Sequence, residues 1–241
     1  MAGTLYMIPI SLGEVDTDHY QPQGSIDLIA RLDTLLVENA RTARQYIRSI
    51  LPDKDIRSMT IYEVDKHDHY SYPEKAVFEK LQDGTDVGFM SEAGCPGVAD
   101  PGARVVADCH ERGIRVVPLV GPSSLLLGLM ASGFSGQRFS FHGYLPYDKD
   151  RRRSLLREMA GSTLKRGETH IFIEAPYRND QLLSELVDLL PPNVRLCLAV
   201  DLTTPDEEIY QMTIKDWKKK LAEHPTFHKR PAVFLIGTTT K

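Results

Sequence analysis

The 241-residue sequence predicts an α/β fold made of two domains, and three observations lead to this expectation. Short apolar runs alternate with segments of helical length along the first 145 residues, a pattern typical of βαβ units and a mainly parallel sheet. Two strand candidates in the second half, residues 194–203 and 207–214, have no helix between them, which favours an antiparallel pair and a mixed sheet. Between the two halves of the chain, a polar, charged segment that contains Pro146 separates an expected domain 1–145 from an expected domain 146–241.

The elements of the first domain follow from its hydrophobic pattern. The helix at residues 101–112 has Pro101 near its start and Gly113 just past its end, as helices favour, and Asp100 stands where a capping side chain would. Parallel strands joined by helical crossovers require helices on both faces of the sheet. We expect strands at residues 4–10, 58–64, 86–91, 114–120 and 138–145, and helices at residues 25–32, 41–50, 73–81, 101–112 and 123–132.

The second domain has fewer helices between its strands. We expect strands at residues 167–176, 194–203, 207–214 and 230–237, and helices at residues 151–161, 178–190 and 215–222. This order predicts a mixed sheet, because a strand that follows another directly returns in the opposite direction.

Composition limits the function without specifying it. A net charge of −4 argues against a protein that coats nucleic acid by bulk electrostatics, although it leaves room for a local basic patch. Three cysteines without CxxC spacing, no signal peptide and no apolar run of membrane-spanning length favour a cytoplasmic protein. We expect no metal site, since the only close histidines, His67 and His69, lie in a polar run typical of a solvated loop.

The informative residues follow the parallel strands. Residues 91–102, SEAGCPGVADPG, form a loop of twelve residues where a βα loop usually has about 2–6. Residues 121–124, GPSS, and 11–16, SLGEVD, follow two other strands. Ligands of open α/β sheets bind beyond the carboxyl ends of the strands, and glycines let a ligand approach the backbone. We therefore interpret the long loop as a rigid ligand cradle; the alternative is a simple surface turn.

Several segments resemble one family. GFMSEAGCPGVADPGARVV (residues 88–106) is similar to the VSDAGTPGISDPG motif of the tetrapyrrole methylase superfamily, the class III S-adenosylmethionine (SAM) methyltransferases. The similarity extends through VVPLVGPSS at residues 116–124 and IFIEAPYR at residues 171–178, and it covers nearly the whole chain. Within this superfamily, the chain most resembles the bacterial branch that methylates a ribose 2′-oxygen of 16S ribosomal RNA. It resembles a divergent member of that branch.

The resemblance implies a homodimer that binds SAM in a cleft between two α/β domains and takes ribosomal RNA as substrate. Carried over residue by residue, the cofactor contacts would be Pro9, Ile10, Ser91, Glu92, Ala93, Gly94, Val98, Ala99, Asp100, Ser123 and Ser124, with Phe172, Ala199, Pro231 and Ala232 from the second domain.

The sequence also contains candidates for a catalytic base and for contacts with RNA. A ribose hydroxyl needs a base to remove its proton, and Glu92 and Glu174, the latter with Arg178 beside it, are candidates. Basic side chains suit phosphate contacts, although a charge run is as often a solvated helix face. The candidates for RNA binding are Arg41, Lys149, Arg151, Arg152 and Arg153.

Departures from the branch leave other functions open. Asn39 replaces an aspartate, Glu92 replaces an aspartate in the long loop, Tyr177 replaces a histidine, and residues 11–16 and 65–72 differ. The first hypothesis is a methyltransferase of ribosomal RNA. The alternatives are a methyltransferase of a small molecule such as a tetrapyrrole precursor, or a non-catalytic protein that binds RNA or ribosomes.

Overall fold

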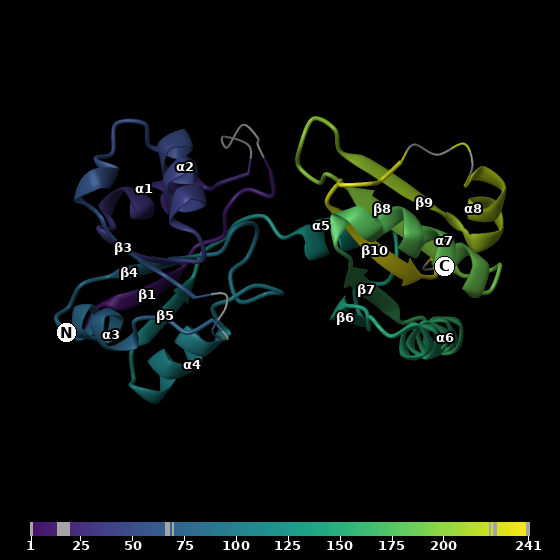
Figure 1. Cartoon of the computed structure of the whole chain (residues 1–241), viewed down its shortest axis with the longest axis horizontal. Coiled ribbons are helices and arrows are strands. Elements are labelled where there is room, and N and C mark those ends of the chain that lie inside the picture. The colour runs from purple at the N-terminus through teal and green to yellow at the C-terminus, as the bar shows by residue number, and fades with distance from the viewer. Residues whose placement is uncertain are drawn as a thin grey trace. The chain divides into compact units, whose positions relative to one another are not determined.

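The chain divides into two compact units, Met1–Ser123 and Ser124–Lys241, in a computed structural model (Figure 1). It describes residues 2–13, 20–65, 68, 70–221, 223 and 226–239. The division lies earlier in the chain than the expected boundary at residue 145. The reason is that helix α5 (Ser124–Ser132) packs against strands of the second sheet, and strand β6 (Phe139–Tyr144) pairs with that sheet.

The first unit is built on a five-stranded sheet in the order β3-β2-β4-β1-β5. All of its strand pairs are parallel, as expected. The strands are β1 (Thr4–Met7), β2 (Thr34–Val37), β3 (Thr60–Glu63), β4 (Val87–Met90) and β5 (Arg115–Pro118). Strand β2 was not predicted, because its four residues, TLLV, follow a helix closely, and periodicity does not separate so short a run from a helix end.

Helices cover both faces of this sheet, which confirms the prediction (Figure 1). One buried cluster joins side chains of α1 and α2 to one face, and another joins those of α3 and α4 to the opposite face. The two clusters alternate along β1, where Leu5 and Met7 face one layer and the following Ile8 faces the other. The helices are α1 (Gln23–Arg31), α2 (Ala40–Ile50), α3 (Glu74–Gln82) and α4 (Ala103–Glu111), with a short 3-10 helix at Ile56–Ser58.

The second unit has a five-stranded sheet in the order β6-β7-β10-β8-β9. Strands β6 and β7 are parallel and the other pairs are antiparallel, so the expected mixed sheet and the antiparallel pair of β8 and β9 are confirmed. Its remaining elements are α6 (Lys149–Arg166), β7 (Thr169–Ile173), a 3-10 helix (Pro176–Arg178), α7 (Asn179–Leu189), β8 (Arg195–Val200), β9 (Glu208–Thr213), α8 (Ile214–Lys220) and β10 (Ala232–Gly237).

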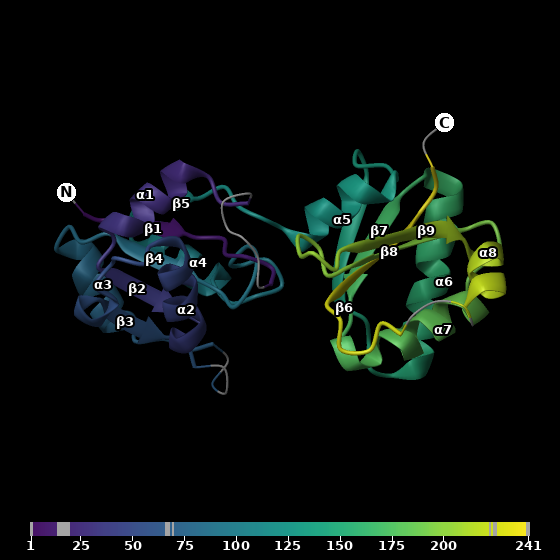
Figure 2. The same cartoon turned by 90° about the horizontal axis from the view of Figure 1, so that it is seen from above.

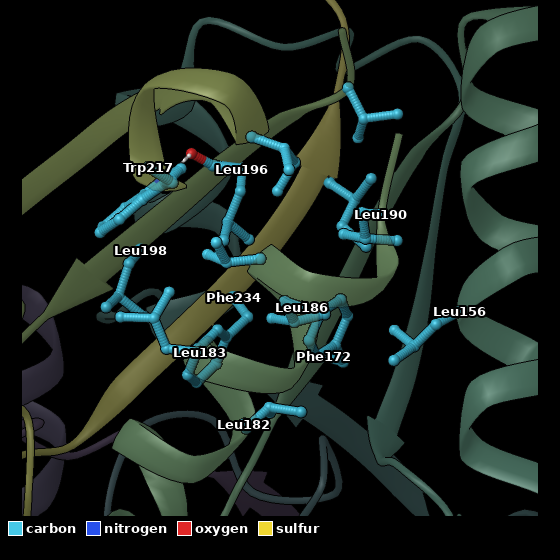
Figure 3. Close-up of a cluster of buried hydrophobic side chains, with 14 of the residues drawn as sticks. Leu156, Phe172, Leu182, Leu183, Leu186, Leu190, Leu196, Leu198, Trp217 and Phe234 are labelled. Atoms are coloured by element: carbon cyan, nitrogen blue, oxygen red, sulfur yellow. Dashed lines mark hydrogen bonds between the residues drawn. The ribbon is translucent and has the colours of Figure 1, made fainter. Parts of the chain in front are cut away.

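The core of the second unit lies between the sheet and helices α6, α7 and α8, while α5 covers the other face (Figure 2). Phe172 and Phe234 stack with ring centroids 5.7 Å apart. Trp217 is fully buried, and its indole N–H donates to the Leu196 carbonyl at 3.0 Å (Figure 3). This bond satisfies the only polar atom of a side chain that would otherwise be costly to bury.

A histidine pair connects β6 to β7 in this unit. His142 Nε2 lies 2.9 Å from His170 Nδ1, and His170 Nε2 is buried without a hydrogen-bond partner among the described residues. Burial lowers the pKa of both rings, and the charge of His142 lowers the pKa of His170 further, against the opposing effect of Glu168. The hydroxyls of Ser162 and Ser140 lower the pKa of Glu168 to about 2.

We expect this pair to make the protein less stable in mild acid. The folded rings have pKa values below the unfolded value of about 6.5, so the unfolded chain binds more protons as the pH falls below that value. The contribution of this histidine pair to stability is therefore fully present above about pH 6.5 and declines below it. Glu168 stays ionised over this range. The Tm should fall between pH 7.5 and 5.5, and His170→Gln should flatten that slope. Equal slopes in the variant and the wild type would contradict this origin.

Candidate functional site

Four loops of the first unit follow the carboxyl ends of its parallel strands. Strand β4 lies between β1 and β2, and the helices that follow those two neighbours cover the opposite face from α4, which follows β4. The chain thus leaves adjacent strands in opposite directions, which defines a topological switch point where open α/β sheets bind ligands. The loop at residues 91–102 begins at this point.

The backbone of the loop at residues 91–102 is tightly turned. Gly94, Gly97 and Gly102 have φ values of 64°, 80° and 135°, and Ala99 has a φ of 64° that side chains other than glycine rarely adopt. The Gly97 N–H donates to the Pro101 carbonyl at 2.9 Å, which closes the loop on itself. A non-glycine residue in this region is a form of strain that concentrates at functional sites.

The loop after β1 is joined to this loop by a two-way backbone bridge. The Ile10 N–H donates to the Gly94 carbonyl at 3.0 Å, and the Gly94 N–H donates to the Ile10 carbonyl at 3.1 Å. Pro9, Ile10, Ser91 and Gly94 are buried, so a ligand would meet mainly their backbone. The structure thereby brings together two of the segments that the sequence predicts for the cofactor.

The loop after β2 contributes a carboxylate that sequence reasoning did not identify. Glu38 Oε2 accepts from the Glu92 N–H at 2.9 Å, and the Glu38 N–H donates to the Met90 carbonyl at 3.0 Å. Asn39 caps α2, since its Oδ1 accepts from the Arg41 and Thr42 N–H groups. An amide oxygen caps a helix as well as a carboxylate does, so the replacement of aspartate at this position is structurally mild.

The loop after β5 completes the group. Cys95 Sγ donates to the Pro122 carbonyl at 3.4 Å, and burial raises the pKa of the Cys95 thiol, which fits a packing residue. A Cβ on Gly121 would lie 2.5 Å from Pro9 Cβ, so only glycine lets these two loops approach so closely. Gly121 is a further residue that the carried-over set omits, although its Gly-Pro dipeptide after a strand was the available signal.

The other predicted residues of the loop at residues 91–102 are accessible to different degrees, and the expected role of one of them is corrected. Glu92, Ala93, Val98 and Ala99 are exposed, with Asp100 half-buried among them. Asp100 does not cap α4: the cap is Gly102, which makes no side-chain capping bond, because the helix begins at Ala103 rather than at residue 101.

The candidates of the second unit gather where β8 ends and β10 begins. Ala199 is paired with Val233, and the Asp201 N–H donates to the Pro231 carbonyl at 2.9 Å beside Ala232. The Phe172 ring is fully buried against Phe234.

Glu174 and Arg178 form an ion pair just past β7. Glu174 Oε2 lies 3.3 Å from Arg178 Nη2, and Oε1 accepts from the Ala175 N–H at 2.8 Å. The Arg178 guanidinium lies 4.7 Å from the centroid of the Tyr147 ring. Both carboxylate oxygens are thus engaged, which favours a positioning role over proton transfer.

The predicted RNA-binding set divides into exposed and buried members. Arg41, Lys149 and Arg151 are exposed, and Arg153 is half-buried with Nε 3.8 Å from Glu185 Oε1. The prediction for Arg152 is wrong. Its side chain is buried, Nη2 lies 2.8 Å from Glu185 Oε2, Nε donates to the same oxygen at 2.9 Å, and Nη1 donates to the Pro146 and Tyr147 carbonyls at 3.0 Å. The register of α6 turns Arg152 inward, beside the exposed Arg151 and the half-buried Arg153.

The described residues contain no group of three or more His, Cys, Asp and Glu side chains arranged to hold a metal ion. His67 and His69 lie outside those residues, as do positions 14–16 of the divergent loop after β1. Among the described helices, none is long and apolar enough to cross a membrane.

Comparison with known proteins agrees with this geometry. The chain is 31% identical over 236 residues to the ribosomal RNA small subunit methyltransferase I of Vibrio cholerae, covering 98% of this chain and 77% of that protein. It is 30% identical to the Haemophilus influenzae protein of the same name, covering 98% and 79%. Its fold matches the uroporphyrin-III C-methyl transferase of Thermus thermophilus, solved with S-adenyl homocysteine, with a TM-score of 0.57, 18% identity and 98% coverage of both chains.

The family model that matches the chain spans both units. It is described as Tetrapyrrole (Corrin/Porphyrin) Methylases and matches residues 9–218, which include the loops after β2, β4 and β5 and the loop after β1 from Pro9 onward. The chain therefore belongs to the tetrapyrrole methylase family.

Proposed function

We propose that this protein is a SAM-dependent methyltransferase that methylates RNA of the small ribosomal subunit, at a ribose 2′-oxygen. The observation that carries the proposal is the joining of the loops after β1, β4 and β5 at the switch point of the first sheet, with Gly121 packed on Pro9 and Gly94 bridged to Ile10. Names of the relatives in Vibrio cholerae and Haemophilus influenzae support the RNA substrate.

The residues present fit the cofactor. Gly94 and Gly97 have positive φ, and a Cβ at Gly121 would lie 2.5 Å from Pro9 Cβ, so glycine allows the tight loop backbone at all three positions. Backbone amides suit a ligand with a carboxylate and a ribose. The residues proposed to hold it are Pro9, Ile10, Ser91–Gly94, Val98–Asp100 and Ser123–Ser124, with Phe172, Ala199 and Pro231–Ala232 from the second unit. When bound, SAM supplies an electrophilic methyl group.

The protein's part in the reaction is to orient the acceptor and take up its proton. Methyl transfer is an in-line displacement, so holding the ribose oxygen at near-attack distance supplies much of the acceleration. We assign the base to Glu92, which is exposed on the loop while its backbone N–H is fixed by Glu38. Glu174 and Arg178 are assigned to positioning of the RNA strand, and Arg41, Lys149, Arg151 and Arg153 to its phosphates.

The proposal includes a homodimer in the cytoplasm. The homodimer follows from the resemblance to the family rather than from any contact of this chain, and the cytoplasmic location follows from the cysteine pattern. Analytical ultracentrifugation of the purified protein tests the dimer, and a monomer at micromolar concentration would remove that part of the proposal.

Transfer of label to RNA tests the function itself. Purified protein, SAM with a tritiated methyl group and small ribosomal subunits from a strain lacking the gene should give labelled RNA. A 2′-O-methyl group blocks alkaline cleavage of the next phosphodiester, so the label should appear in alkali-resistant dinucleotides. Label in mononucleotides would indicate base methylation, and no label in RNA from these subunits would contradict the proposed substrate.

A further inference from the structure

Two exposed tyrosines stand at the end of the second sheet where β6 and β7 terminate. Tyr147 comes three residues after β6 and its side chain is 85% exposed, and Tyr177 follows β7 and is 64% exposed. Because β6 and β7 are parallel, their carboxyl ends lie at the same edge. Both rings are therefore accessible to a partner at this edge.

An arginine adjoins both tyrosines, one in space and the other in the chain. Arg178 follows Tyr177 in the chain and places its guanidinium 4.7 Å from the Tyr147 ring centroid. Glu174, which is buried, holds this guanidinium from the other side at 3.3 Å. The ion pair and the ring contact together hold the guanidinium against the Tyr147 ring.

The backbone of both tyrosines is also fixed. The buried Arg152 donates to the Tyr147 carbonyl at 3.0 Å, and His228 Nδ1 lies 3.2 Å from the Tyr177 carbonyl. The Lys229 N–H donates to the Pro176 carbonyl at 2.9 Å. Rings held on a fixed backbone lose less conformational entropy when a partner binds them.

The charges beside the rings suit a polyanion. Lys149 and Arg151, in the first turn of α6, are exposed, and Lys229 stands next to the Tyr177 segment. Cationic side chains that track a phosphate backbone beside aromatic faces are the general arrangement for binding unpaired nucleic acid. A duplex would not use the rings, because its bases are stacked on one another.

We propose that Tyr147, Tyr177 and Arg178 form a stacking platform for unpaired nucleotides of the RNA substrate. This inference rests on the proposed function and narrows it: the protein recognises a segment of RNA whose bases are unstacked, through ring contacts that carry little sequence preference. Methyl transfer does not require the platform chemically, so it contributes to binding of the RNA.

The test measures binding of RNA directly. A fluorescein-labelled uridine oligoribonucleotide of about ten nucleotides and a duplex of the same length are titrated against wild type, Tyr147→Ala, Tyr147→Phe and Tyr177→Ala. Loss of one stacked base should weaken binding of the single strand by about 5- to 150-fold in both alanine variants. Tyr147→Phe should bind as wild type does, and the affinity for duplex should not change.

The control is Tyr70→Ala, which removes a tyrosine that is 47% exposed in the first unit. It should leave single-strand affinity unchanged, and calorimetric titration should give the same SAM affinity in every variant. Wild-type affinity in Tyr147→Ala, equal losses for single strand and duplex, or no binding of the single strand by wild type would each overturn the platform. Labelled RNA from wild type with no dependence on Tyr147 would defeat the platform alone, whereas absence of label would defeat the proposed function.

Discussion

Arg152→Ala is expected to lower the free energy of unfolding by about 3–5 kcal/mol, because removing one partner of a buried ion pair leaves an uncompensated charge. The charge left behind is Glu185, whose side chain is 13% exposed and whose Oε2 lies 2.8 Å from Arg152 Nη2. Its other oxygen would keep only Arg153 Nε at 3.8 Å, which is too far for a hydrogen bond. Two carbonyls, those of Pro146 and Tyr147, would also lose their donor. Urea unfolding followed by circular dichroism measures the change.

The matched control is Arg151→Ala, the exposed neighbour on the same turn of α6. It should change stability by less than about 0.5 kcal/mol and should weaken RNA binding. Equal stability losses in the two variants would mean that the buried ion pair does not distinguish them. An Arg152→Ala protein as stable as wild type would contradict the structural role assigned to this arginine.

Gly121→Ala is expected to weaken SAM binding by more than about tenfold, a loss that corresponds to about 1.4 kcal/mol. The new methyl group would lie 2.5 Å from Pro9 Cβ and 3.0 Å from Pro9 Cγ. Neither proline atom belongs to a side chain that can rotate away, so the loop after β1 must move away from the loop after β5. Calorimetric titration with SAM measures the loss, which should come with about 1–3 kcal/mol of lost stability.

Gly24→Ala provides the control for Gly121→Ala. A Cβ at Gly24 meets no atom within 4 Å, and the position lies in helix α1, where alanine is favoured over glycine by about 1 kcal/mol. This variant should be at least as stable as wild type and bind SAM equally well. If Gly121→Ala were destabilised yet kept wild-type SAM affinity, the loops after β1 and β5 would not belong to the cofactor site.

Much of the fold could be predicted from sequence because strands and helices here have distinct periodicities. The parallel first sheet, its helices on both faces and the antiparallel pair of β8 and β9 were predicted correctly. The unit boundary was not, since α5 and β6 look like one more βα repeat of the first domain. Only long-range pairing of β6 with β7 assigns them to the second unit, and local pattern carries no information about such pairing.

The candidate site was predictable at the level of loops and less so at single residues. Gly and Pro after strands predict which loops bind a ligand, and the structure brings the loops after β1, β4 and β5 together. The direction in which each side chain points could not be predicted in this way. Arg151, Arg152 and Arg153 are consecutive and chemically alike, yet only Arg152 turns inward, which depends on the register of α6 against Glu185. The contact of Glu38 with the Glu92 N–H likewise joins residues 54 positions apart.

The most direct measurement of the central claim is a competition for the methyl group. One reaction contains the purified protein, tritiated SAM, total RNA and the small-molecule extract of a strain lacking the gene, and Gly121→Ala serves as the parallel reaction with a damaged cofactor site. A SAM-dependent RNA methyltransferase predicts label in small-subunit ribosomal RNA, with little in the Gly121→Ala reaction. Label that appears only in the small-molecule fraction would contradict it.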